Sequence, residues 1–306
     1  MQNTVKSAVR FTGTGLHTGA PVTMTIHPAS ADYGIWFRRS DILVGDAMIP
    51  ARWDVVEQTP LCTRLINSAG ASVSTVEHVM AALAGTGVHN VLIEIDGPEV
   101  PILDGSSAEF VRGILEAGLA VQSVEIRAIE ILKPVTVTRD GASATLVPSN
   151  NLKIDFHIDF EDEAIGIQDK SLTMANGSFV RELCDSRTFC RKSDVDAMHA
   201  SGLALGGTLE NAVVVDGDDI LSPGGLRHND EAVRHKMLDA LGDLYLAGAP
   251  ILGKYTGVRA GHALTNALLR ELFMTPGAFR IVECDAHTTA RLPGAGVHLA
   301  EIPAVA

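Results

Sequence analysis

Apolar and polar residues alternate along several short segments of the chain, which is the pattern of β-strands with one buried face. The segment from Leu152 to Phe160 shows it most clearly, with apolar side chains at every second position. Other short segments are rich in β-branched and aromatic residues and lie between turn-forming residues. Strands are therefore predicted over residues 10–16, 22–27, 35–38, 61–66, 90–95, 129–137, 142–147, 152–160, 212–215 and 251–258.

Longer segments with apolar residues at helical spacing predict helices between these strands. One begins after Ser74-Thr-Val-Glu77, which matches a capping box, and ends at the glycines of residues 85–87. The longest predicted helix covers residues 230–246, and others are predicted over 107–117, 194–200 and 264–273.

The order of these elements repeats along the chain. Each half runs through strands, a long helix, a strand and another helix, and both long helices carry a His-x-Met sequence, at His78 and His235. This order indicates, without proving, an internal duplication. We predict an α+β fold of two similar domains, 1–125 and 126–306, each a sheet-plus-helices layer.

The segment His235-Lys-Met-Leu-Asp239 carries the most specific chemistry. In a helix, His235 and Asp239 stand one turn apart on one face, with Asp243 one turn further on. An imidazole and a carboxylate at that spacing converge on one divalent metal, and His78 is the candidate third ligand. Three ligands leave an open position, which catalysis requires. The alternative is that these are ordinary helix residues with a solvated carboxylate.

Acid–base groups accompany the predicted ligands. Glu77 precedes His78 and is a candidate general base, unless its carboxylate serves the capping box, because the two roles exclude each other. His262 follows Gly261, and Asp243 is placed to raise its pKa and keep it cationic, either to stabilise an oxyanion or to protonate a leaving amine.

Three further residues are weaker candidates. Thr188 offers a hydroxyl for an oxyanion, Lys236 an ammonium for a phosphate, and Phe160 a ring that stacks on a base or sugar. A loop threonine, a solvated lysine and a core phenylalanine are the ordinary interpretations of the same residues.

Composition narrows the classes of function. Of the 306 residues 46% are hydrophobic, enough for substantial cores, and the net charge of −13 argues against nucleic-acid binding. No segment has the apolar length of a signal peptide or a membrane span. The four cysteines form no C-x-x-C pair. We expect a cytoplasmic protein with reduced thiols; the sequence identifies no protein partner.

Several motifs together resemble the UDP-3-O-acyl-N-acetylglucosamine deacetylases, zinc enzymes at the committed step of lipid A synthesis in Gram-negative bacteria. The motifs run in order from residue 10 to about 270. They are Thr14-Gly-Leu-His17-Thr-Gly19, Ser74 to Gly85, Pro98 to Ser106, Arg187-Thr-Phe189, Val233 to Asp243 and Gly261-His-Ala-Leu264.

The resemblance implies His78, His235 and Asp239 as ligands of one Zn²⁺, and leaves open whether Fe²⁺ replaces it in the cell. It implies Glu77 as general base, and His262, oriented by Asp243, as the cation beside the oxyanion or leaving amine. The oxyanion would also receive a hydrogen bond from Thr188. Residues expected to contact the UDP-linked, acylated substrate are Lys236, Phe160, Phe189, Leu61 and Thr63.

The resemblance also implies that the two layers pack helix to helix with the active site between them. It implies that an insertion near residues 191–215 forms a passage for the acyl chain. Here the sequence departs from relatives, with Cys190-Arg191-Lys192 where an apolar residue is common and Leu209 where an aromatic ring can sit. Acyl-length preference is therefore not predicted. Two alternatives to this function remain: a metal hydrolase acting on another amide or ester, and a non-catalytic, metal-stabilised binding module.

Overall fold

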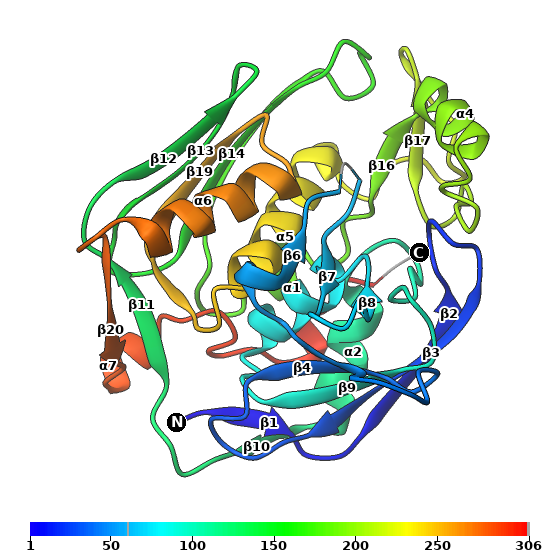
Figure 1. Ribbon diagram of the computed structural model, residues 1–306. Coiled ribbons are helices and arrows are strands. Elements are labelled where there is room, and N and C mark those ends of the chain that lie inside the picture. Colours follow the sequence, from blue (N-terminus) through cyan, green and yellow to red (C-terminus); the bar gives the residue numbers. More distant parts are fainter. Residues whose placement is uncertain (60, 305–306) are drawn as a thin grey trace.

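The structure is a computed structural model that describes residues 1–59 and 61–304 (Figure 1). Two sheets lie on the outside, and helices fill the space between them. At the centre, α1 (Glu77–Thr86) packs directly against α5 (Glu231–Tyr245). Every residue of α1 is buried, which agrees with its uninterrupted run of apolar and small residues from Val79 to Gly85.

The N-terminal sheet has five strands. Its order in space is β2 (Val9–Thr14), β3 (Pro21–Pro28), β9 (Val91–Ile95), β4 (Ile35–Arg39) and β5 (Met48–Pro50). The β9–β4 pair is parallel, and the other neighbouring pairs are antiparallel. The strand β9 follows α1 in the chain and lies in the middle of the sheet.

The C-terminal sheet repeats this arrangement. Its corresponding strands are β12 (Val135–Arg139), β13 (Ala142–Pro148), β19 (Ile251–Val258), β14 (Lys153–Asp159) and β15 (Ile167–Thr173). Here the β19–β14 pair is the parallel one. Two strands extend the sheet, β11 (Arg127–Ile131) and β20 (Phe279–Glu283). The shared order and direction confirm the predicted α+β fold of two similar layers.

Each layer carries an insertion before its long helix. The first contains η1 (Trp53–Val55) and a small sheet of β6 (Val56–Glu57), β7 (Arg64–Ile66) and β8 (Ser72–Val73). The second contains α3 (Ser178–Glu182), β16 (Phe189–Arg191), α4 (Lys192–Ala200), β17 (Val213–Asp216) and β18 (Asp219–Ile220). In Figure 1 the second insertion stands at the upper right, across from the C-terminal sheet.

The remaining elements complete the two layers. After the central strands come α2 (Ala108–Ala117) and α6 (His262–Met274). The strands β1 (Asn3–Val5) and β10 (Leu119–Val121) pair with each other, and α7 (Ala286–Thr289) and η2 (Leu299–Glu301) lie near the C-terminus. The chain passes from β10 to β11 where we placed the domain boundary; the division into 1–125 and 126–306 stays a prediction.

Three expectations about local structure were wrong. The single strand predicted over 129–137 is two strands, β11 and β12, separated at Leu132-Lys-Pro134, because proline cannot donate to a ladder. The strand predicted from Leu61 begins only at Arg64. The capping box before α1 does not form: the N-cap is Val76 without a side-chain bond, and the amide of Ser74 donates to the carbonyl of Pro98.

Candidate metal centre

The contact between α1 and α5 brings three predicted ligands together. His235 Nε2 lies 3.2 Å and His78 Nε2 3.7 Å from Asp239 Oδ1. Ligand atoms of all three residues lie within 4.8 Å of one another. The two histidine rings meet edge to face, with ring centroids 5.1 Å apart. Two helices from different halves of the chain therefore supply one compact cluster.

The state of these side chains fits a divalent cation. Burial, and then the neighbouring His235, lowers the pKa of His78 to about 3, and burial also lowers the pKa of His235, so both imidazoles are neutral. Burial alone would raise the pKa of Asp239, but the neighbouring His235, Lys236 and His262 side chains outweigh burial, so the carboxylate stays ionised. Asp239 Oδ1 is buried and accepts no hydrogen bond from any residue that the structure describes. An unpaired buried carboxylate oxygen facing two neutral imidazoles is a suitable ligand set for a metal.

A backbone carbonyl orients one of the rings. His235 Nδ1 lies 3.0 Å from the carbonyl oxygen of Ser186, to which it donates, so that Nε2 faces Asp239. Such an outer partner fixes the tautomer of a ligand histidine. Reasoning from the sequence missed Ser186, because a main-chain oxygen leaves no trace in the residue type.

Glu77 faces the same space as the three ligands. Its Oε2 accepts a hydrogen bond of 3.0 Å from the amide of Thr63, and its Oε1 lies 3.7 Å from His262 Nε2. Burial, opposed by His262 but supported by Asp243 and Asp239, raises its pKa to about 8. Since the capping box is absent, the competing role we had considered for this carboxylate is removed.

His262 is the first residue of α6 and lies beside two acidic groups of the cluster. Its Nδ1 donates to Asp243 Oδ2 at 2.8 Å, and its Nε2 lies 3.8 Å from Asp239 Oδ2. Burial lowers the pKa of His262, but Asp243, Glu77 and Asp239 together outweigh burial and raise it to about 9. The imidazole is therefore cationic near neutral pH, with Nε2–H directed at the site.

Several of the other predicted site residues contact this cluster or one another. Lys236 donates to Asp239 Oδ2 at 2.8 Å, and this carboxylate raises the lysine pKa against the opposing effect of burial. Phe160 and Phe189 pack edge to face at 5.4 Å, and Phe189 lies 6.3 Å from the ring of His235. Leu61 is exposed, whereas Thr63 is buried. Their contacts with a substrate stay predictions.

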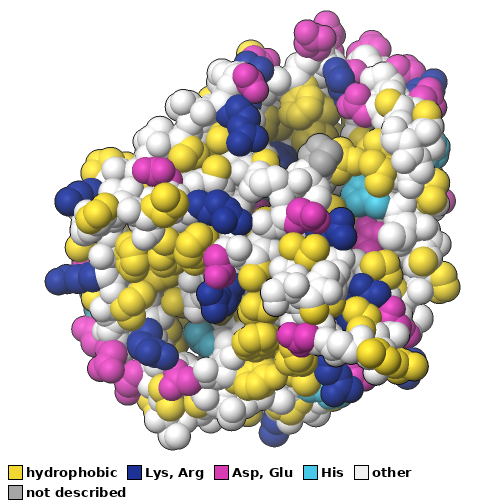
Figure 2. All heavy atoms as spheres, viewed as in Figure 1, with side chains coloured by type: hydrophobic (Ala, Val, Ile, Leu, Met, Phe, Trp, Pro, Cys, Tyr) yellow, Lys and Arg dark blue, Asp and Glu magenta, His cyan; other side chains and the backbone are white. Residues whose placement is uncertain are grey.

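A cavity of about 350 Å³ lies under the second insertion, lined mostly by apolar side chains. Thr188 and Phe189 stand on its wall, together with Leu16, Cys190, Val195 and Leu209. The space-filling view shows a further hollow, between the second insertion and the C-terminal sheet, of which hydrophobic side chains form part (Figure 2). The cavity lies where we predicted an acyl passage.

The two cationic residues of the Cys190-Arg191-Lys192 segment, where the sequence differs from relatives, are paired with acidic groups. Arg191 forms ion pairs with Asp194 at 2.9 Å and with Asp162 at 3.7 Å, and Lys192 pairs with Asp216 at 3.1 Å. Their charges are therefore neutralised by partners of the insertion itself and of the 161–166 loop. The wall that remains is apolar apart from a few polar side chains.

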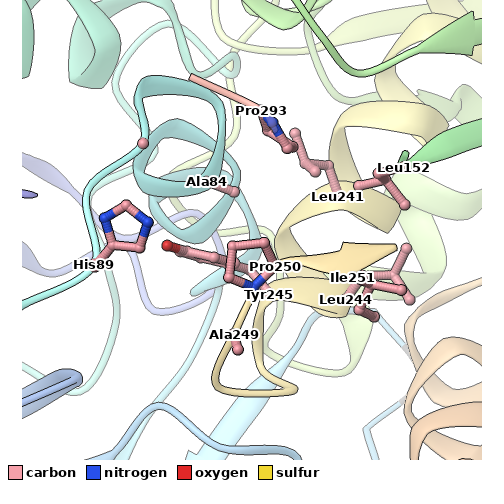
Figure 3. Close-up of a pocket in the computed structure, with 11 residues that line it drawn as sticks. Ala84, His89, Leu152, Leu241, Leu244, Tyr245, Ala249, Pro250, Ile251 and Pro293 are labelled. Carbon is pink, nitrogen blue, oxygen red and sulfur yellow. The ribbon is translucent and has the colours of Figure 1, made fainter. Parts of the chain in front are cut away.

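A second hollow, between the C-terminal ends of α1 and α5, is shown in Figure 3. Ala84, Leu241, Tyr245 and Pro293 are among its lining residues. The hydroxyl of Tyr245 donates to the carbonyl of Val88, and the cavity measures only about 10 Å³. This hollow has no room for a substrate.

Known proteins of one family match the chain over nearly its whole length. The family described as UDP-3-O-acyl N-acetylglycosamine deacetylase matches residues 2–274. A UDP-3-O-acyl-N-acetylglucosamine deacetylase of Phenylobacterium zucineum is 49% identical over 280 residues, which cover 92% of this chain and 96% of that protein. Proteins of the same name from an Anaeromyxobacter species and from Shewanella frigidimarina are 46% and 42% identical, covering at least 95% of each chain.

Proposed function

The chain belongs to the UDP-3-O-acyl N-acetylglycosamine deacetylase family, and on that basis we propose that it hydrolyses the N-acetyl group of UDP-3-O-acyl-N-acetylglucosamine. The products are acetate and the free 2-amine, and the reaction is a step of lipid A biosynthesis. The observation that carries this proposal is the placement of Glu77 and His262 against the His78, His235 and Asp239 cluster.

The proposed cofactor is one Zn²⁺ held by His78, His235 and Asp239. Two imidazoles and one carboxylate with a vacant fourth position are the ligand set of catalytic zinc sites. When bound, zinc supplies a Lewis acid that polarises the amide carbonyl and makes water a better nucleophile.

Glu77 is the proposed general base. Its Oε1 points into the space beside the ligands, because the Thr63 amide holds Oε2 on the far side. A carboxylate so placed accepts the proton of the attacking water as the new C–O bond forms. The C–N bond of the tetrahedral species then breaks, and the amine leaves with a proton.

His262 carries positive charge at the other side of the same space. Asp243 holds its Nδ1, which leaves the Nε2–H free to donate to the oxyanion or to the departing amine. Thr188, on the wall of the apolar cavity, is the proposed hydroxyl donor to the oxyanion.

The parts of the substrate remote from the amide have matching surfaces. The 350 Å³ apolar cavity under the second insertion suits the 3-O-acyl chain. Lys236 and Phe160 are the proposed contacts for the diphosphate and the uridine. No helix of the described residues is long and apolar enough to cross a membrane. We place the enzyme in the cytoplasm, where a nucleotide-linked sugar is available as substrate.

The test is acetate release from the purified protein, measured together with its metal content. The UDP-linked sugar should be hydrolysed far faster than N-acetylglucosamine, because binding energy from the acyl chain and nucleotide assists the chemical step. Equal rates on both would favour a less specific amide or ester hydrolase. Removal of metal by a chelator should leave a folded, inactive protein; unfolding would favour a metal-stabilised binding module.

A further inference from the structure

Glu77 and Asp243 are buried carboxylates on neighbouring helices. Each is only 3% exposed. The helices approach closely here, because a Cβ added to Gly242 would lie 2.1 Å from the carbonyl oxygen of Glu77. Two negative groups in so small a volume repel each other, and each buried oxygen needs a hydrogen-bond donor to stay in one place.

Thr63 supplies two such donors. Its amide donates to Glu77 Oε2 at 3.0 Å, and its hydroxyl donates to Asp243 Oδ1 at 2.5 Å. The remaining oxygen of each carboxylate faces His262: Asp243 Oδ2 accepts from Nδ1, and Glu77 Oε1 lies 3.7 Å from Nε2. Thr63 thus holds Oε2 of Glu77, the proposed base, and Oδ1 of Asp243, the residue that orients His262.

The loop that carries Thr63 is itself held in place. The carbonyl of Thr63 accepts a hydrogen bond of 3.3 Å from the amide of Val76, the residue before α1. The hydroxyl of Thr59 donates to the carbonyl of Cys62, and β7 begins at Arg64 and pairs with both β6 and β8. The small sheet of the first insertion therefore fixes where the two donors of Thr63 stand.

We propose that Thr63 is a positioning residue for the deacetylation: its amide and hydroxyl hold Glu77 and the Asp243–His262 pair in one mutual arrangement. This proposal rests on the proposed function and differs from the expectation that Thr63 contacts the substrate. Both donors of Thr63 are engaged with carboxylates, and only 3% of the residue is exposed to solvent. Loss of the hydroxyl should therefore act on kcat and leave KM nearly unchanged.

The test compares Thr63→Val with Thr63→Ser. Valine keeps the shape and the amide but removes the hydroxyl, whereas serine keeps the hydroxyl. Thr63→Val should lower kcat about 10–100-fold, the usual cost of losing an outer hydrogen bond at such a site. Thr63→Ser should recover most of that loss, and the metal content of both variants should equal that of the wild type.

The matched control is Thr86→Val. Thr86 is fully buried near the end of α1, and its hydroxyl donates to the carbonyl of Ala82, away from both carboxylates. Its kcat should match that of the wild type. A double-mutant cycle adds a sharper readout: Thr63→Val should cost much less in an Asp243→Ala background, because the acceptor of the hydroxyl has been removed.

Four results would overturn the positioning role: an unchanged kcat in Thr63→Val, a Thr63→Ser variant as slow as Thr63→Val, full additivity in the cycle, or a raised KM with unchanged kcat. The last would mark Thr63 as a substrate contact. A wild-type protein that releases no acetate would overturn the deacetylase proposal as well. An active wild type with an equally active Thr63→Val would overturn the positioning role alone.

Discussion

The two halves of the molecule share a framework and differ in chemistry. Both long helices have a histidine, then a methionine two positions later and a glycine seven positions later. These residues are His78, Met80 and Gly85 in α1, and His235, Met237 and Gly242 in α5. Together with the repeated strand order, this match supports an internal duplication in which the two candidate metal-binding imidazoles are equivalent positions.

The acidic groups occupy positions at which the two helices differ. Counted from the shared histidine, Asp239 corresponds to Ala82, Asp243 to Thr86, and Glu77 to Arg234. Arg234 pairs with Asp230 and Glu182 instead of facing the cluster. The shared framework thus accounts for the two histidine rings, whereas each acidic group with a proposed catalytic or ligand role belongs to one half only. The predictions below test this division.

The largest loss of activity should come from replacing the histidines at the equivalent positions of the two long helices. His78→Ala and His235→Ala should each bring acetate release close to background and metal content toward zero, because two remaining ligands hold zinc weakly. Metal analysis of the purified variants measures this. His287→Ala, which changes an exposed histidine on α7, is the control. Full metal content in either of the first two variants would contradict the proposed ligand set.

Replacing Glu77, which has no acidic counterpart in α5, should lower catalysis without lowering metal binding. Glu77→Ala should lower kcat about 10²–10⁴-fold, the usual contribution of a general base, while metal content stays near that of the wild type. Steady-state kinetics with metal analysis provides the measurement. Glu283→Ala on the exposed face of β20 should behave as wild type. A parallel loss of metal and activity in Glu77→Ala would argue against the assigned role.

A smaller and more specific effect concerns the charge of His262. Asp243, with Glu77 and Asp239, raises the pKa of His262 to about 9 despite burial. Asp243→Asn removes a negative charge that favours the imidazolium, so the pKa should fall and the alkaline limb of kcat/KM should move to lower pH. Asp169→Asn is the matched control, since Asp169 pairs with His157 at the surface. An alkaline limb unmoved in Asp243→Asn would contradict this role of His262.

The smallest expected change in activity comes from alanine substitutions at the two equivalent glycines, Gly85 and Gly242. A Cβ at Gly85 would lie 1.9 Å from the Phe179 ring, and one at Gly242 would lie 2.1 Å from the Glu77 carbonyl oxygen. Each alanine variant should lose about 1–3 kcal/mol of unfolding free energy by overpacking, measured by denaturant titration. Only Gly242→Ala should also lower kcat, because its neighbour is the backbone of the base. Equal kcat in both variants would remove the distinction.

Most strands and helices could be predicted from the sequence, because each buries one face or all of its faces and therefore has a recognisable pattern of apolar residues. The strand β14 and the helix α5 have the residue spacing of their structures, and the one-turn spacing of His235 and Asp239 identified two members of the cluster. The strand β15 was not predicted, since Ile167 is 69% exposed and the strand offers no clean apolar face. It forms because it pairs along the whole of β14.

What the sequence did not predict depends on main-chain groups and on contacts between distant segments. The Ser186 carbonyl and the Thr63 amide hold His235 and Glu77, but any residue type has these groups. The motif before α1 matched a capping box, yet Glu77 is directed to Thr63 because the tertiary contact replaces the local one. Local patterns therefore identified the residue types of the candidate site better than the hydrogen bonds that place them.

Because the candidate ligand cluster spans α1 and α5, its affinity for a metal ion would depend on how the two layers pack against each other. A metal that binds only when both layers are correctly placed stabilises the native state by RT ln(1 + [L]/Kd). Any substitution that shifts one sheet against the other, however far from the cluster, would raise the Kd for the metal. Metal titration would then detect misalignment of the layers that a measurement of secondary structure would miss.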